Sequence, residues 1–194
     1  MAGIQSFSNL IWSTADLLRG SYKQADYGKV ILPLTVLRRL DQVLEPTRGA
    51  VRERAAELEA RGVVNVEPAL QRAAGGRFFN TSRHSFASLR DDPASLGPNL
   101  RSYIAGFSET AREALDHFGF EQQIDKLERA NLLYQVVGRF ADVDLHPDRI
   151  SNLEMGYLFE EWTLGPASRR SAPPSGTTLT VGAGRSSRGT RMPG

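Results

Sequence analysis

Apolar residues recur at helical spacing over most of the first 160 residues, and the repeat is clearest between residues 28 and 45. There the apolar and polar positions separate into two faces of a helix: Val30, Leu34, Leu37, Leu40 and Leu44 on one, and Thr35, Arg38, Arg39 and Gln42 on the other. This division predicts an amphipathic helix with one face in the core and the other in solvent. Pro33 leaves two readings open, because a helix either begins at that proline or runs from Gly28 and is kinked by it.

The same periodicity predicts further helices before and after this one. The first runs from about Ser6 to Leu18, and Gly20 stands where a C-terminal cap glycine is expected. The last begins after Ser151, where Glu154 three residues later completes a capping box. Between them, helices are predicted over residues 47–62, 100–107, 109–118 and 120–142, the last with a break near Ala130.

Residues 63–98 form the least regular part of this body. The aromatic pair at 78–79 and the stretch 82–89 form either a short β-hairpin or a loop packed by its aromatic side chains. Residues 91–93 and 96–98 have the Asp, Gly and Pro content of turns. This part of the chain is therefore predicted to connect helices rather than to add a regular layer.

Composition changes after Trp162. Of the 32 residues from Thr163 to Gly194, 20 are Gly, Pro, Ser or Thr. Such a segment buries too little apolar surface to offset its ordering entropy, so we expect it to be disordered. The predicted organisation is a mainly α fold, with an N-terminal helical bundle domain over residues 1–162, one short β-hairpin as an option, and a non-homologous tail over residues 163–194.

Charge and cysteine content exclude several classes of protein. The five arginines of the tail account for the basic pI, and removing them from the net charge of +2 leaves −3 for residues 1–162. The body therefore has no bulk positive charge that would indicate nucleic-acid binding. Cysteine is absent, which excludes disulfides, thiolate zinc sites and a thiol nucleophile. No apolar run approaches the roughly 20 residues that cross a bilayer, and we expect a cytoplasmic protein.

Two segments carry a family resemblance. The first is NLIWSTADLLRGSYKQADYGKVILPLTVLRRLDQVLEPTR, residues 9–48, and the second is HPDRISNLEMGYLFEE, residues 146–161. Together they resemble the N-terminal helical domain of the modification (M) subunits of type I restriction–modification enzymes. The resemblance implies a part in adenine-N6 methylation of DNA. It further implies S-adenosylmethionine as the cofactor of the full-length family, and a complex of two M subunits with one DNA-specificity (S) subunit.

The chemistry implied by this resemblance needs two motifs that the sequence lacks. One is a glycine-rich turn after a strand, which holds the cofactor, and the other is an Asn-Pro-Pro-aromatic tetrapeptide, which holds the flipped adenine. Residues 172–175 read Ala-Pro-Pro-Ser, without the polar anchor or the aromatic ring, and residues 179–184 lack the third glycine and a following helix. We therefore expect no catalytic and no cofactor-binding residue, no S-adenosylmethionine bound by this chain, and a chain truncated or frame-shifted near residue 162.

Two groups of charged residues remain as candidate sites. Asp142, Asp144, His146 and Asp148 form either a divalent-metal cluster or a turn in which Asp caps backbone N–H groups. We favour the turn, and assign no metal ligand.

The other group consists of Lys23, Arg38 and Arg39, which are candidate contacts to DNA or to a partner subunit. The alternative is a solvated helix face on which the arginines pair with Asp41 and Glu45. The expected partners are the methyltransferase catalytic domain, the S subunit and a second M subunit, with DNA in the assembled complex and no membrane.

Other functions stay open at this stage. The chain is also consistent with a non-catalytic interaction module that completes a separately encoded methyltransferase half, and with a pseudogene product. A stand-alone DNA-binding helical protein fits less well with the acidic body. A domain that normally covers a catalytic domain is expected to leave an exposed apolar face when that domain is missing.

Overall fold

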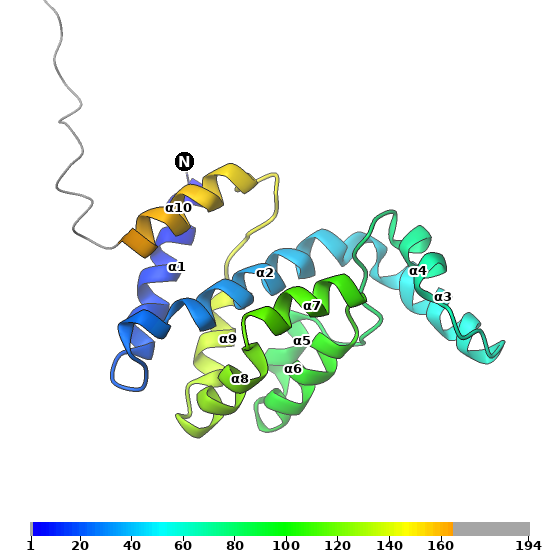
Figure 1. The fold of residues 1–194 in the computed structure, drawn as a ribbon, viewed down its shortest axis with the longest axis horizontal. Coiled ribbons are helices and arrows are strands. Elements are labelled where there is room, and N and C mark those ends of the chain that lie inside the picture. Colours follow the sequence, from blue (N-terminus) through cyan, green and yellow to red (C-terminus); the bar gives the residue numbers. More distant parts are fainter. Residues whose placement is uncertain (1, 165–194) are drawn as a thin grey trace, which may run out of the picture.

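The computed structural model describes residues 2–164, which form a mainly α-helical fold (Figure 1). The mainly α prediction is confirmed. No strand occurs among the described residues; Asn80 and Phe107 form an isolated antiparallel bridge. The α-helices are α1 (Ala2–Leu18), α2 (Gly28–Leu44), α3 (Arg48–Ala60), α4 (Glu67–Ala74), α5 (Phe86–Asp91), α6 (Leu96–Ala105), α7 (Glu109–His117), α8 (Phe120–Arg129), α9 (Leu133–Ala141) and α10 (Asn152–Leu164), and the short 3-10 helices are η1 (Gln24–Asp26), η2 (Glu45–Thr47) and η3 (Pro93–Ser95).

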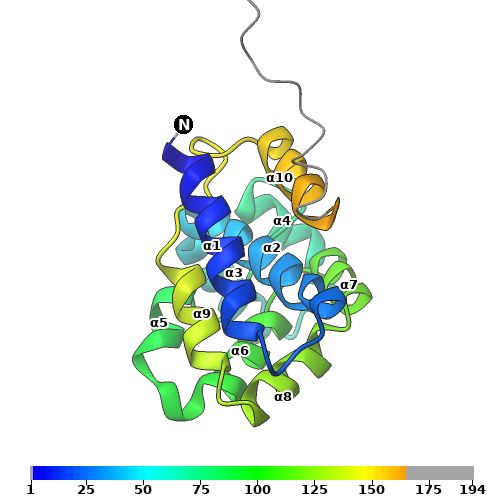
Figure 2. The ribbon, with the colours of Figure 1, turned by 90° about the vertical axis from the view of Figure 1, so that its left-hand side faces the viewer.

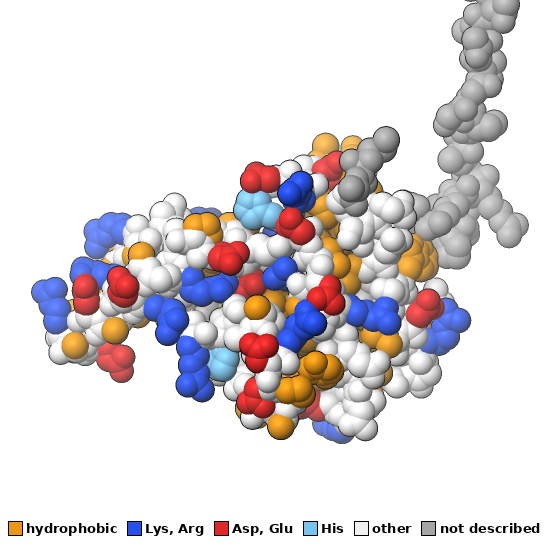
Figure 3. Space-filling model, turned by 180° about the vertical axis from the view of Figure 1, so that it is seen from behind, with side chains coloured by type: hydrophobic (Ala, Val, Ile, Leu, Met, Phe, Trp, Pro, Cys, Tyr) orange, Lys and Arg blue, Asp and Glu red, His pale blue; other side chains and the backbone are white. Residues whose placement is uncertain are grey.

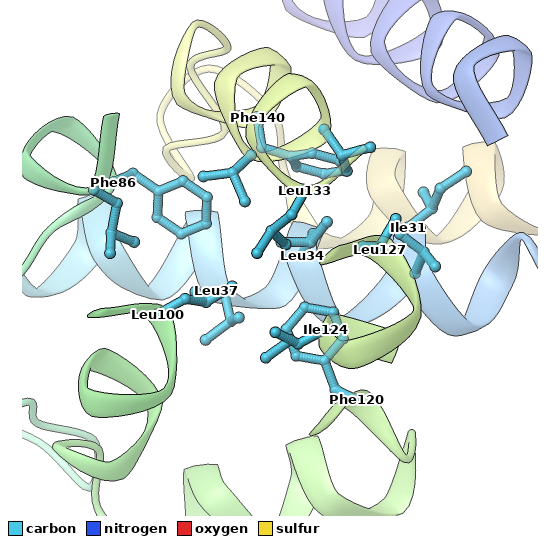
Figure 4. Close-up of a cluster of buried hydrophobic side chains, with 14 of the residues drawn as sticks. Ile31, Leu34, Leu37, Phe86, Leu100, Phe120, Ile124, Leu127, Leu133 and Phe140 are labelled. Carbon is cyan, nitrogen blue, oxygen red and sulfur yellow. The ribbon is translucent and has the colours of Figure 1, made fainter. Parts of the chain in front are cut away.

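Helix α2 is the centre around which the other helices pack. Its apolar side chains meet those of α5, α6, α8 and α9 in one core (Figure 4). The residues at the middle of this core are all fully buried or nearly so: Ile31, Leu34, Leu37, Phe86, Leu100, Phe120, Ile124, Leu127, Leu133 and Phe140. Burial of this many apolar side chains is the main driving force for the bundle.

The polar face of α2 is half-buried rather than exposed, so the predicted solvent exposure of that face is wrong. Thr35 is 0% exposed, and its hydroxyl donates to the carbonyl of Ile31 at 2.7 Å. Asp41 is 6% exposed. The segment between α9 and α10 lies along this face and accepts hydrogen bonds from it, so polar side chains can be buried there without losing their partners.

The end of α1 and the start of α2 test two of the sequence predictions. Gly20 has φ +91°, which suits glycine, and the N–H groups of Ser21 and Tyr22 donate to the carbonyl of Leu18 at 3.1 and 2.9 Å. The predicted glycine cap is confirmed, although α1 begins four residues earlier than expected. Helix α2 begins at Gly28 and continues through Pro33, so the reading in which the helix starts at the proline is wrong.

The irregular region contains two short helices that the sequence pattern does not predict. Helix α5 begins with a reciprocal cap between Ser85 and Ser88. The β-hairpin alternative does not occur among the described residues, because the chain at residues 79–81 pairs with the end of α6 instead. The N–H of Thr81 donates to the carbonyl of Gly106 at 2.9 Å, and the N–H of Ser108 donates to that of Phe79 at 3.1 Å.

The structure also tests the predicted turn at residues 96–98 and the predicted break near Ala130. Residues 96–98 form the first turn of α6 rather than a loop, since proline is tolerated where the N–H has no helical acceptor. The predicted break near Ala130 is confirmed. Asn131 has φ +55°, and it separates α8 from α9.

Helices α3 and α4 pair with each other and project from one end of the bundle (Figure 1). They carry a small core of their own, made of Val51, Leu58, Leu70 and Phe79. The outer surface of α3 is therefore not covered by the main bundle.

Helix α10 lies against α1 (Figure 2), where the Phe7 and Phe159 rings meet edge to face at 5.5 Å. Its predicted capping box is confirmed: the Ser151 N–H donates to the Glu154 carboxylate at 2.8 Å, and the Glu154 N–H donates to the Ser151 hydroxyl at 3.2 Å. No helix between residues 2 and 164 is long and apolar enough to cross a membrane. The predictions for residues 165–194, including those for 172–175 and 179–184, lie outside the described residues.

Candidate DNA and partner contact site

The sequence contains three lysines, and the fold brings all of them to the connection between α1 and α2. Lys23 precedes η1, Lys29 lies in the first turn of α2, and Lys126 comes from α8, about a hundred residues later. All three act electrostatically on the carboxylate of Asp26. We refer to Lys23, Lys29 and Lys126 as the lysine cluster.

The local fold holds two members of the lysine cluster, Lys29 and Lys126, in place. The ammonium of Lys29 lies 2.8 Å from the carboxylate of Asp26, and that of Lys126 lies 3.8 Å from the centre of the Tyr22 ring. Tyr22 is itself buried, with its hydroxyl donating to the carbonyl of Gln123 at 3.4 Å. Hydrophobic burial of one aromatic ring thus positions a cation above it.

The electrostatics of this cluster are positive overall. The hydrogen bond from Lys29 lowers the pKa of Asp26, and the charges of Lys126 and Lys23 lower it further. Burial, with the negative charge of Asp26, raises the pKa of Tyr22 to about 12, so this phenol is neutral at ordinary pH. Three ammonium groups therefore face one carboxylate, and Lys23, Lys29 and Lys126 are all exposed. Exposed ammonium groups can bind phosphate oxygens of DNA, which releases counterions from the DNA.

Arg38 and Arg39 belong to a different part of the molecule from Lys23. They lie ten and eleven residues into α2, about 15 Å along the helix from its start. The Nε of Arg38 donates to the carbonyl of Val143 at 3.0 Å, and its Nη1 donates to Asp41 at 3.1 Å. The three candidate residues are thus not brought together as one patch.

Arg39 binds the segment between α9 and α10, residues 142–151, which we call the connector. Its Nη1 lies at 2.9 Å from the carbonyl oxygen of Leu145, 2.8 Å from that of Ile150 and 3.0 Å from the Met155 sulfur. Its Nη2 donates to the side-chain oxygen of Asn152 at 2.8 Å. Burial lowers the pKa of this guanidinium from its ordinary value. Most donors of Arg39 are therefore used within the chain, and its contact with DNA or a partner stays a prediction.

Asp41 is the centre of a buried polar network between α2, α3 and α6. Its carboxylate accepts from Arg48 at 2.6 Å, from the hydroxyl of Tyr103 at 2.9 Å and from Arg38 at 3.1 Å. Burial raises the pKa of Tyr103 well above 10, and the charge of Asp41 adds to the effect. The pairing of Arg38 with Asp41 was one of the sequence alternatives. The parts of Arg48 and Tyr103 were not predicted, because nothing local connects residue 41 to residue 103.

The acidic residues near the end of α9 form a turn, as favoured from the sequence. The Asp144 carboxylate accepts from the side chain of Gln42 at 2.9 Å and from the N–H of His146 at 3.0 Å. The side-chain oxygen of Gln42 accepts from the N–H of Leu145 at 2.7 Å. Within the part of the chain that the structure describes, no group of three or more acidic or histidine side chains is arranged to hold a metal ion.

The sequence was compared with models of known protein families. The family model for the HsdM N-terminal domain matches residues 7–140, which is more than half of the chain. The chain belongs to the HsdM N-terminal domain family. This domain is the N-terminal domain of the M subunit of type I restriction–modification systems. A search of curated proteins finds no match.

The HsdM N-terminal domain match begins within α1 and ends within α9. It includes the lysine cluster and the Asp41 network, while the connector and α10 follow it. Both features thus belong to the matched domain.

Proposed function

We propose that this chain serves in site-specific adenine-N6 methylation of DNA, as the N-terminal, non-catalytic part of an M subunit. It acts in an assembly of two M subunits and one S subunit. The observation that carries the proposal is the match of the HsdM N-terminal domain over residues 7–140. In this assembly S-adenosylmethionine is the methyl donor, and a catalytic domain other than the helical one binds it.

Two features support a non-catalytic part for the helical domain. A cofactor turn of the methyltransferase type is built between a strand and a helix, and residues 2–164 contain no strand. The sequence also contains no Asn-Pro-Pro-aromatic tetrapeptide. Without these groups the domain cannot orient a methyl donor against an adenine amino group. We therefore propose that the domain contributes by binding DNA or the other parts of the enzyme.

The lysine cluster supports contact with DNA at the sugar–phosphate backbone. Its ammonium groups are exposed, and those of Lys29 and Lys126 are held by Asp26 and Tyr22. Contacts of this kind carry no sequence information and add affinity that falls as salt rises. This agrees with an assembly in which a different subunit recognises the DNA sequence.

A second candidate function, a module that completes a separately encoded catalytic half, is favoured by α10. Met155 and Phe159 on this helix pack inward, while Leu153 and Tyr157 are 66% and 62% exposed. A helix with apolar residues on both faces is typical of one that is covered on both sides. In this case the same domain would act in trans rather than within one chain.

The test uses the purified chain with labelled S-adenosylmethionine and duplex DNA. We expect no label in the DNA and no cofactor binding by calorimetry. A parallel reaction contains a complete M subunit with its S subunit, and shows that the assay detects methyl transfer. Methylation of adenine by the chain alone would contradict the proposal.

A further inference from the structure

Among residues 1–162, the longest stretch without an acidic residue is at residues 68–90. It contains Arg72, Arg77, Arg83 and Arg90 but no Asp or Glu, although residues 1–162 as a whole have a net charge of −3. In the fold it covers nearly all of α4 and α5 and the segment between them, which joins the projecting α3–α4 end to the bundle. Lys and Arg side chains lie close together at this junction (Figure 3). Positive charge gathered in this way indicates an anionic partner.

Three of these four arginines have no acidic partner. Arg72, Arg77 and Arg83 are exposed, and none of them forms an ion pair with another described residue. Arg90, by contrast, pairs with Asp142. The positive charge of this stretch is therefore mostly open to a partner.

The charge of Arg72 is balanced in part by its surroundings. This side chain borders an open pocket together with Glu53 and Glu57 of α3. Arg77 and Arg83 follow the end of α4. The cations that are left unbalanced thus lie on either side of residues 78–82 in the sequence.

The two aromatic residues between these cations have different surroundings. Phe79 is 4% exposed and belongs to the small core of α3 and α4, while Phe78 is 39% exposed. An exposed aromatic ring with guanidinium groups beside it is the combination that binds unpaired nucleobases, because the ring stacks on a base and the cations bind the neighbouring phosphates. An acidic peptide would use the arginines alone and would not need the ring.

The backbone that carries the ring and the cations is fixed by the bundle. The side chain of Asn80 donates to the carbonyl of Tyr103 at 3.1 Å and accepts from the N–H of Ser82 at 2.7 Å. A Cβ added at Gly106 would lie 2.5 Å from the side-chain oxygen of Asn80, so the close approach of the two segments requires glycine there. A site on a fixed backbone loses less conformational entropy when it binds.

His84 orients Arg83. The Nε of Arg83 donates to the Nε2 of His84 at 3.4 Å. Burial, with the charge of Arg83, lowers the pKa of His84, so this ring is neutral at ordinary pH and can accept the bond. Asp92 acts on His84 in the opposite direction, but its carboxylate accepts from the N–H of Ser95 at 3.2 Å. The two Nη groups of Arg83 are left for a phosphate.

We propose that residues 77–83 bind single-stranded DNA, with one unpaired base stacked on Phe78 and the phosphates beside it held by Arg77 and Arg83. The bases of a duplex are already stacked on one another, so a base reaches this ring only after it has left the helix. The lysine cluster is a separate site, because it lies at the start of α2, while the projecting end follows the end of α2.

The inference rests on the proposed function for its setting only, because adenine methylation takes a base out of the DNA helix and so creates unpaired bases. The binding itself is a property of this chain, and its test uses the chain with oligonucleotides and no other subunit. The site can therefore fail while the domain still supports methylation, and the reverse also holds.

The first measurement compares two fluorescein-labelled strands by fluorescence anisotropy, a ten-residue oligothymidine and an abasic strand with the same phosphates. The two strands have the same charge, so all cations of the chain contribute equally to both affinities. We expect the chain to bind oligothymidine about tenfold more tightly, because the abasic strand cannot stack on an aromatic ring.

Three variants test whether Phe78 causes this preference. Phe78→Ala should abolish it, whereas Phe78→Tyr keeps an aromatic face and should retain it. The matched control is Tyr134→Ala on α9, which removes a ring that is 47% exposed and should leave the preference unchanged. Circular dichroism checks that each variant is folded. The proposal is overturned if the chain does not prefer oligothymidine, if Phe78→Ala keeps the preference, or if Tyr134→Ala lowers it as much.

A double variant tests the phosphate contacts. Arg77→Gln combined with Arg83→Gln should reduce the slope of log affinity for oligothymidine against log salt by about 1.4, since each phosphate contact to a single strand contributes about 0.7. The matched control is Arg129→Gln, an exposed cation on α8 that should leave the slope unchanged. An unchanged slope in the double variant would overturn the part of Arg77 and Arg83 in the proposal.

Discussion

Asp41 accepts three hydrogen bonds where α2, α3 and α6 meet, from Arg38, Arg48 and Tyr103. A carboxylate that is 6% exposed has lost most of its hydration, and the two guanidinium groups replace it. These residues contribute both charge balance and hydrogen bonds. The network therefore fixes how the α3–α4 pair joins the bundle.

Removing the charge of Asp41 should destabilise the fold strongly. We expect Asp41→Asn to lower the free energy of unfolding by about 3 kcal/mol, because two partly buried arginines lose their counter-ion. Tyr103→Phe keeps the ring and removes one donor, so a loss of about 1 kcal/mol is expected. Urea unfolding followed by circular dichroism measures both.

The control for this prediction is Asp16→Asn, which breaks an exposed ion pair with Arg19. We expect a change below about 0.5 kcal/mol there, since surface pairs contribute little. An Asp41→Asn variant no less stable than Asp16→Asn would show that the network is not needed for the fold.

At the scale of elements, the long periodic helices could be predicted and the short ones could not. Gly20, Ser151 and the break near Ala130 follow from capping rules that act within a few residues. Helices α4 and α5 have eight and six residues, too few for an apolar repeat to show. They are stabilised by contacts with distant segments, as at Phe79 and Ser108, which sequence periodicity does not contain.

The capping box of α10 gives a prediction at this scale. The N–H of Ser151, together with its hydroxyl, lowers the pKa of Glu154 from its ordinary value of 4.5. The stabilising effect of this carboxylate is therefore present above 4.5 and is lost as pH falls through the lowered pKa. We expect an NMR titration of the Glu154 carboxyl to show a midpoint below 4.5.

Ser151→Ala is the matched variant for this titration. It removes the hydroxyl and leaves the backbone N–H, so the midpoint should move part of the way back toward 4.5. An unchanged midpoint would mean that the hydroxyl does not stabilise the carboxylate. A midpoint at 4.5 in the unmodified chain would mean that the capping box does not form in solution.

For the whole molecule, the candidate site depends on contacts that no local pattern contains. Lys23 and Lys126 are about a hundred residues apart, and periodicity gives no reason to place them together. Arg38 and Arg39 were expected on a solvated face, but a segment from residues 143–155 covers them. The family could be recognised from the sequence. The spatial arrangement of the charged side chains could be seen only in the folded structure.

The lysine cluster predicts a salt-dependent contact with DNA in the assembled enzyme. We expect Lys23→Gln combined with Lys126→Gln to reduce the slope of log affinity against log salt by about 2, if each ammonium neutralises one phosphate. The matched control is Arg112→Gln, an exposed cation on α7. An unchanged slope in the double variant would exclude the lysine cluster from the DNA contact.

The central claim is tested most directly by supplying this domain in trans. An M subunit that lacks its N-terminal domain is combined with the S subunit and DNA, and adenine-N6 methylation is measured with and without this chain. We predict that methylation is low without the chain and rises at least tenfold with it, while the chain alone gives none. Methylation that is unaffected by the chain, with the shortened subunit confirmed to be folded, would contradict a non-catalytic part in the modification enzyme.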